Sequence, residues 1–259
     1  MAKRSTPEKK KSGPHTSAWR TFEQNLDSIS HMLALGRREM IALRAQAARM
    51  VKYVEKVREL EPNLRQDKLT RSVQRFAKTF ATRVERFQVI NQWQIVALVT
   101  CVEAYLQDFL AAAAAVDSEL MAKSEQRATY SDIIEATALD VLGGALRTRW
   151  ARNWLSEGGP PLWIRKLEKM GARGYGPTLG RRLELFWGIR HLAVHSAGVA
   201  TVDFVKRHPG VVKAVGDRVK VNNNYFKSFV VAVREFMKPT EEYFLRRYPS
   251  MAAAAPIPP

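Results

Sequence analysis

The segment that most constrains this fold is an apolar stretch over residues 90–115, which includes a run of five alanines. Its apolar positions lie nearly all round a helix rather than along one stripe, and such a helix belongs at the centre of a bundle. Glu103 is the only charged residue between Arg86 and Asp108. Because a buried, unpaired carboxylate is costly, we expect Glu103 either to lie on a narrow exposed stripe with Gln107 or to pair with an arginine or a histidine.

Elsewhere the apolar residues recur at spacings of three and four, which is typical of amphipathic helices and predicts an all-α bundle with an N-terminal helical extension. Helices are expected over 18–60, with an interruption near Gly36, and over 67–87, 90–115, 131–146, 162–172 and 178–198. A last helix is expected from Asn223, with a break at Pro239. Only 211–221 has strand character, giving at most a minor β-hairpin.

These patterns divide the chain into four parts. They are a disordered basic tail at 1–17, an N-terminal helical region at 18–88, a helical bundle at 89–248 and a disordered low-complexity tail at 249–259.

The charge balance points to a polyanionic partner. Lys and Arg number 42 against 25 acidic residues, a formal net charge of +17. The first seventeen residues hold five basic residues and one acidic residue, so about +13 of this charge belongs to the rest of the chain. Nucleic acid is the commonest partner for so basic a protein. A solubility bias or an anionic membrane surface are the alternatives.

The sequence also bears on compartment. The single cysteine, Cys101, excludes an intramolecular disulfide and a cysteine-based zinc cluster. The N-terminus lacks the apolar core of a signal peptide. The longest uncharged stretch, 87–102, is shorter than the roughly 18 residues expected of a membrane span. We therefore expect a cytoplasmic protein with no membrane partner.

Basic and aromatic residues alternate in the segment 147–154, where Arg147, Arg149 and Arg152 are interleaved with Trp150 and Trp154. Such a pattern can stack on bases and hold phosphates, although it also suits an amphipathic turn with two buried tryptophans. These three arginines are candidate RNA-binding residues. Arg181 and Arg182, near the start of the helix predicted over 178–198, are two further candidates.

Most of the potential chemistry lies in residues 186–198, which read as the end of an apolar helix closed by Gly198 in a left-handed C-cap. His191 and His195 are four residues apart and share a helix face, whereas Arg190 lies about 140° round the helix from His195. Histidine has an ordinary pKa near neutrality, and the arginine fork suits phosphate. The same residues would also serve as capping and dipole partners at a helix C-terminus.

A zinc site is disfavoured here. The two histidines have the spacing of a zinc-binding pair, but Leu192, Ala193 and Val194 stand between them, without the glutamate of the H-E-x-x-H motif. His208 stands in a turn with Pro209 and is no obvious third ligand. We expect no metal and no cofactor.

The segment resembles the HEPN superfamily of small all-helical proteins. Arg190, the polar residue at 191 and His195 match its R-polar-x3-H signature. The layout downstream is also similar, with these features in order: Ala197-Gly198, Asp203-Phe204, His208-Pro209, a short run at 217–221 and a closing helix from Asn223. The resemblance covers residues 89–245.

This resemblance implies a metal-independent RNA endonuclease of a toxin or antiviral-defence kind. The ribose 2′-hydroxyl would attack the adjacent phosphate, with His195 transferring a proton and Arg190 stabilising the phosphoryl charge. His191 would orient or assist, and Glu103 would lie beside the motif as a partner of Arg190 or a histidine. The resemblance further implies a homodimer through the motif helix and a restraining antitoxin or sensor protein.

A second hypothesis is a catalytically inactive helical module that binds RNA, a nucleotide or a partner protein. The feature that separates the two hypotheses is whether His195 and Arg190 from two subunits point into one basic, solvent-open groove, as the nuclease requires. A His195 that is buried and bonded to backbone carbonyls would weigh against the nuclease.

Overall fold

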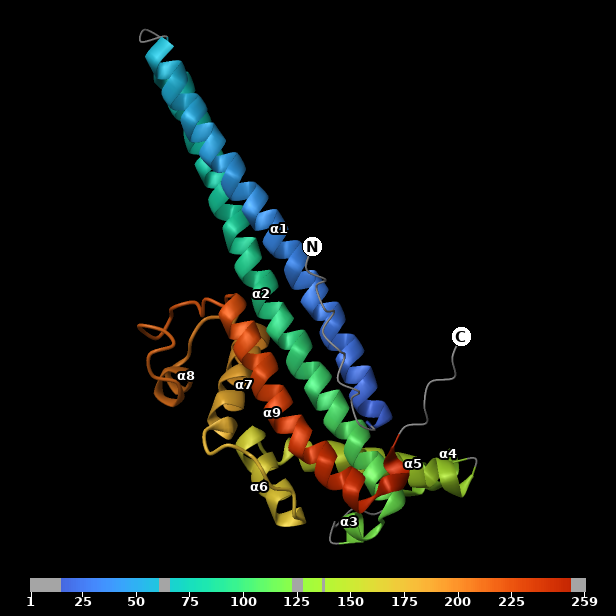
Figure 1. The fold of residues 1–259 in the computed structure, drawn as a ribbon. Helices are drawn as coiled ribbons and strands as arrows, with labels where there is room; N and C mark the ends of the chain where they lie inside the picture. Colours follow the sequence, from blue (N-terminus) through green and yellow to red (C-terminus); the bar gives the residue numbers. More distant parts are fainter. Residues whose placement is uncertain (1–14, 61–65, 123–127, 137, 253–259) are drawn as a thin grey trace, which may run out of the picture.

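The computed structural model describes residues 15–60, 66–122, 128–136 and 138–252, and these residues form helices and no strand. The helices are α1 (Ser17–Leu60), α2 (Gln66–Val116), α3 (Glu119–Ala122), α4 (Tyr130–Glu135), α5 (Leu139–Ser156), α6 (Pro160–Met170), α7 (Leu179–His195), α8 (Val202–Arg207) and α9 (Asn223–Arg247), followed by the 3-10 turn η1 (Pro249–Met251). The all-α prediction is confirmed. α1 and α2 form a long arm that projects from a body built around the second half of α2 (Figure 1).

α1 and α2 are longer than predicted. α1 continues through Gly36, and α2 joins the two helices predicted over 67–87 and 90–115 into one helix of 51 residues. At 1.5 Å per residue, α2 is about 75 Å long. The predicted breaks are wrong because α1 and α2 pack along each other, and such packing outweighs the cost of a helical glycine, about 1 kcal/mol.

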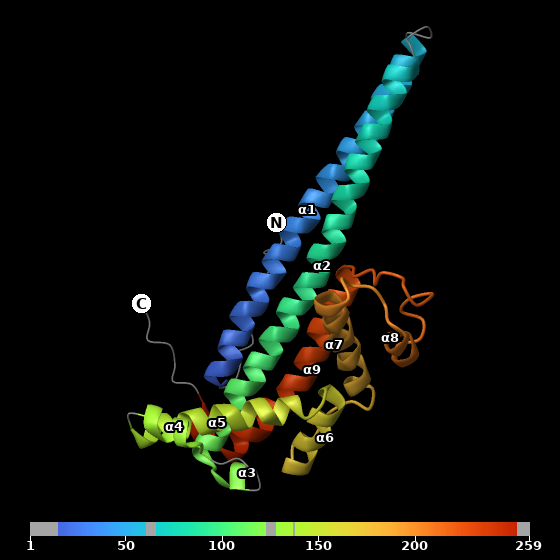
Figure 2. The same ribbon diagram turned by 180° about the vertical axis from the view of Figure 1, so that it is seen from behind.

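The second half of α2 is the central core helix, as its composition predicts. Its fully buried side chains include Ile95, Leu98, Val99, Val102, Leu106, Phe109, Leu110 and Ala113. It contacts α5 and α7 extensively and α9 to a lesser extent. Figure 2 shows α7 and α9 lying beside it, with α5 crossing the end of the bundle. By its length and its composition alone, the segment Val89–Val116 could span a membrane. In this structure 44% of its apolar stretch is buried inside the body.

α1 starts inside the body. Phe22, near its first turn, is buried in the same core as α2. The buried Glu241 carboxylate on α9 accepts hydrogen bonds from the Thr16 backbone N–H at 3.2 Å, from the Thr16 hydroxyl, and from the Tyr105 hydroxyl at 3.0 Å. Burial and the charge of Glu241 raise the pKa of Tyr105 well above its usual value. The division between parts that the sequence suggested after residue 88 lies inside α2, which is continuous.

α9 runs through Pro239 without a break, so the interruption predicted there is wrong. A proline lacks the N–H that a helix needs, but the next residue helps to hold the turn, since the Thr240 hydroxyl donates to the Phe236 carbonyl at 2.8 Å. The tail predicted from 249 begins with η1, in which Met251 is buried. The parts of the two predicted tails at 1–14 and 253–259 lie outside the described residues.

The segment 211–221 does not fold into a hairpin of its own. An isolated antiparallel bridge joins Val199 to Arg218, and the Ala200 N–H donates to the Asp217 carbonyl at 2.8 Å. The Gln92 side chain on α2 donates to the Val219 carbonyl at 2.9 Å. This segment is thus held between α2 and the residues that follow α7.

Candidate functional site on helix α7

α7 presents a buried apolar face and ends as the sequence predicts. Leu183, Phe186, Ile189 and Leu192 are buried at spacings of three. Gly198 has φ +77°, and its N–H donates to the Leu192 carbonyl at 2.9 Å. This confirms the predicted left-handed glycine after the helix. The face of the last two turns opposite the buried one carries polar side chains.

The two histidines of the motif lie together on that outer face. His191 and His195 are both exposed, and their ring centroids are 4.6 Å apart with the planes inclined by 45°. His195 is therefore open to solvent rather than buried against backbone carbonyls. The environment that would weigh against the nuclease is therefore not the one that His195 has, while a groove shared by two subunits stays a prediction.

Arg190 opens into a pocket of about 390 Å³ next to this pair. The pocket is lined by residues of α7, of α8 with its two cap residues, and of the start of α6: Gly159, Pro160, Glu184, Trp187, Gly188, Arg190, His191, Leu192, Thr201, Asp203, Phe204, Arg207 and His208. The Nε atom of Arg190 is buried and has no hydrogen-bond partner among the described residues. Because Arg190 lines the pocket, a ligand bound there would lie next to its side chain. Arg190 and His191 thus share a pocket, with His195 one turn further along α7.

α8 forms the far wall of this pocket and brings in residues to which the sequence analysis gave no role in catalysis. A Cβ on Gly188 would lie only 3.1 Å from His208 Nε2 and from Phe204, so the glycine lets α8 approach α7 closely. The His208 ring packs on Phe204 with centroids 4.9 Å apart. Burial lowers the pKa of His208 below its usual 6.5, with Arg207 adding to this shift and Glu184 opposing it.

Glu103 has a different partner from those expected. Its carboxylate accepts a hydrogen bond of 2.9 Å from the Trp187 indole N–H, in the turn of α7 before His191. No ion pair or hydrogen bond joins it to Arg190 or to a histidine among the described residues. Glu103 therefore fixes the orientation of α7 on α2 rather than contacting the motif.

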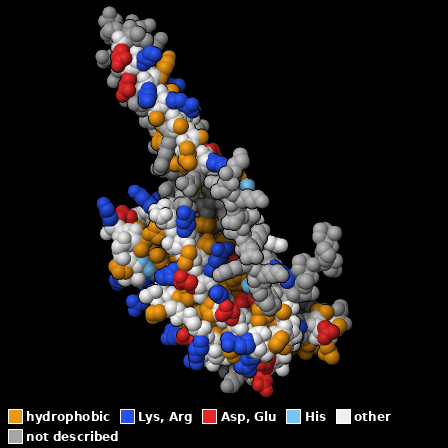
Figure 3. Space-filling view, in the orientation of Figure 1, with side chains coloured by type: hydrophobic (Ala, Val, Ile, Leu, Met, Phe, Trp, Pro, Cys, Tyr) orange, Lys and Arg blue, Asp and Glu red, His pale blue; other side chains and the backbone are white. Residues whose placement is uncertain are grey.

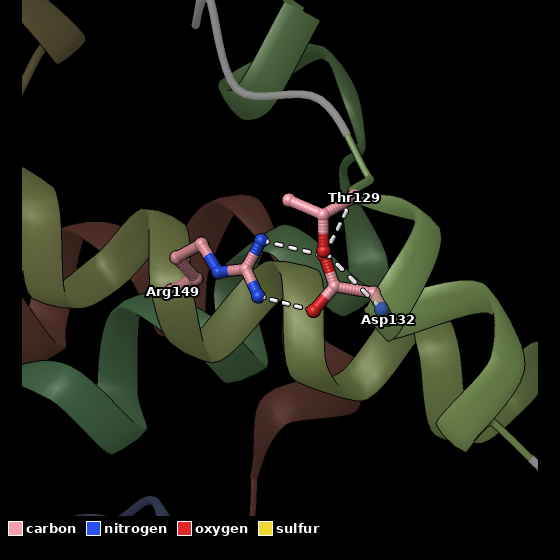
Figure 4. A network of polar contacts seen from close by, with 3 residues as sticks. All are labelled: Thr129, Asp132 and Arg149. Atoms are coloured by element: carbon pink, nitrogen blue, oxygen red, sulfur yellow. Dashed lines mark hydrogen bonds and ion pairs between the residues drawn. The ribbon is translucent and has the colours of Figure 1, made fainter.

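Arg149 is engaged in a local ion pair (Figure 4). Its guanidinium holds Asp132 in a two-pronged contact, with one N–H···O distance of 2.8 Å. Asp132 also accepts hydrogen bonds from the backbone and hydroxyl of Thr129, both at 2.7 Å. Arg149 and then Thr129 keep the pKa of Asp132 below its usual range. Arg149 thus ties α5 to the start of α4.

The other four predicted RNA-binding arginines differ in how free they are. Arg152 and Arg181 are exposed, while Arg147 is half-buried with its guanidinium against Gly143. Arg182 forms an ion pair of 2.5 Å with Glu235. Arg181 precedes His195 by fourteen residues, or about 20 Å along the helix, so Arg181 and its neighbour Arg182 lie away from the motif.

On one face of the molecule the basic charge is distributed rather than collected at one place. On the face shown in Figure 3, Lys and Arg side chains are spread over the body and the α8 region with acidic side chains between them. The described ranges contain no group of three or more His, Cys, Asp or Glu side chains arranged to hold a metal ion.

Comparisons of this chain with models of protein families, with curated proteins and with solved structures find no match.

Proposed function

We propose that this protein is an RNA endonuclease that cleaves without a metal ion at the C-terminal end of α7. One arrangement carries the proposal. The exposed His191–His195 pair lies beside Arg190, which lines a pocket and whose buried Nε has no partner among the described residues. Side chains that can transfer protons thus stand next to a cation that forms no ion pair within the described part of the chain.

The chemistry is an intramolecular transesterification. The ribose 2′-oxygen bonds to the adjacent phosphorus as it loses its proton, and the P–O5′ bond breaks as the departing oxygen gains one. The products carry a 2′,3′-cyclic phosphate and a 5′-hydroxyl. His195 acts in proton transfer, which typically contributes 10²–10⁴-fold, and His191 orients or assists it. Arg190 stabilises the negative charge that develops on the phosphoryl oxygens.

The resemblance to the HEPN superfamily extends this proposal to the substrate, the oligomeric state and the biological role. The substrate is RNA, whose backbone the exposed Arg152 and Arg181 can contact. A homodimer through the exposed side of α7 would bring two copies of the histidine pair together. A toxin or antiviral-defence role in the cytoplasm, restrained by an antitoxin or a sensor protein, completes the proposal.

The test is cleavage of labelled single-stranded and structured RNAs in EDTA by the wild type and by His195→Ala. His31→Ala is the matched control, because His31 is exposed on α1 away from the motif. We expect cleavage by the wild type and His31→Ala only. RNA binding that weakens with salt, with no cleavage by any of the three, would support the binding module instead.

A further inference from the structure

α8 forms one wall of the pocket beside α7. This wall carries a third histidine, His208, which the R-polar-x3-H motif does not contain. Its approach to α7 depends on Gly188, since a side chain at that position would meet His208 Nε2 and Phe204 at 3.1 Å. The Thr201 side chain caps α8 by accepting from the Phe204 N–H at 3.3 Å. A short capped helix and a glycine gap thus hold His208 in place at the pocket.

The residues of α7 that face α8 follow one strip. Glu184, Gly188 and His191 all line the pocket and recur at spacings of four and three, and His195 is four residues further on. Arg190 lines the same pocket. A phosphodiester bound to Arg190 would therefore have His208 on the α8 side and His191 on the α7 side, with the His195 ring next to His191.

On the basis of the proposed function, we propose that His208 is the general base of RNA cleavage. His208 takes the proton of the ribose 2′-hydroxyl as the 2′-oxygen bonds to phosphorus. The His191–His195 pair gives a proton to the departing 5′-oxygen as the P–O5′ bond breaks. One proton is taken up and one is released, so the step needs no other reactant.

The electrostatic surroundings suit this role. The charged and titratable side chains lining the pocket beside His208 are Glu184, Arg190 and His191 from α7 and Asp203 and Arg207 from α8, while the start of α6 adds only Gly159 and Pro160. Burial and Arg207 favour the neutral imidazole of His208 over its cation, and Glu184 opposes them. A general base must be neutral before it takes a proton.

The test compares single-turnover cleavage by His208→Gln and His208→Ala with the wild type, with melting curves to confirm that both variants fold. We expect His208→Gln to cleave about 10²–10⁴-fold more slowly, while binding of a non-cleavable 2′-deoxy analogue is unchanged. Added imidazole should restore cleavage by His208→Ala in proportion to its free-base fraction, which a purely structural role would not produce.

The outcomes are distinguishable from those of the proposed function. Wild-type cleavage that His195→Ala abolishes but His208→Gln retains would overturn the assignment of His208 alone. Loss of analogue binding in His208→Gln, with no rescue by imidazole, would also overturn it. No cleavage by the wild type would overturn both proposals.

Discussion

Gln92 on α2 packs so closely against Gly198 that a Cβ on the glycine would lie 2.2 Å from Gln92 Nε2. The same side chain donates to the Val219 carbonyl, so it cannot withdraw without losing a buried hydrogen bond. This contact fixes the end of α7, and with it the positions of His191 and His195, against the central helix.

Replacing Gly198 tests that contact. Gly198→Ala combines the strain of a left-handed backbone, about 1–2 kcal/mol, with an overpacking cost of about 1–3 kcal/mol. Gly210→Ala is the matched control, since Gly210 also has a positive φ, +86°, but has open space around its Cβ position. Chemical denaturation should show the larger loss of stability for Gly198→Ala. Equal losses would mean that Gln92 moves aside freely.

The carboxylate of Glu241 is predicted to secure the start of α1. Glu241→Gln leaves one of the three donors from Thr16 and Tyr105 without an acceptor, which costs about 1–3 kcal/mol. Glu242→Gln, its exposed neighbour, should change stability by less than about 0.5 kcal/mol. Urea denaturation of the two variants makes the comparison. A Glu241→Gln variant as stable as the wild type would contradict the role given to this carboxylate.

The Glu103–Trp187 hydrogen bond predicts a difference between two substitutions of one residue. Glu103→Ala strands the partly buried indole N–H and should cost about 1–3 kcal/mol, whereas Glu103→Gln keeps an acceptor and should cost less. Denaturation followed by tryptophan fluorescence measures both. Indistinguishable stabilities would show that the bond does not contribute to holding α7 on α2.

His208 gives a pH-dependent contribution to stability whose sign follows from its lowered pKa. The unfolded chain takes up a proton near pH 6.5, and the folded protein does so only at a lower pH. The free energy of unfolding should therefore fall as the pH drops from 6.5 towards the folded pKa. His208→Gln should remove this component when unfolding is measured across that range. An unchanged pH profile would contradict the burial of His208.

Periodicity and composition were sufficient to predict the parts of the fold that depend on local sequence. The apolar stretch around Val99 became the core helix, and the glycine at 198 ended α7 in a left-handed conformation. The pairing of His191 with His195 follows directly from their four-residue spacing on a helix. Each of these features is set within a few turns of one helix.

The features that depend on packing between distant segments were not predictable. His208 joins the pocket because Gly188 leaves room for α8, and nothing in the local sequence connects these two residues. Arg149, which the sequence predicts to bind RNA, is held by Asp132, seventeen residues away in the chain. Pro239 signalled a helix break that the surrounding core prevents.

The most direct test of the central claim uses an RNA with a single 2′-deoxynucleotide at a mapped cleavage site, incubated with the wild-type protein in EDTA. Attack by the 2′-hydroxyl predicts that cleavage stops at that position only, while unmodified RNA yields 2′,3′-cyclic phosphate and 5′-hydroxyl ends. Cleavage at the 2′-deoxy position, or no cleavage of unmodified RNA at all, would contradict the mechanism proposed for Arg190, His191 and His195.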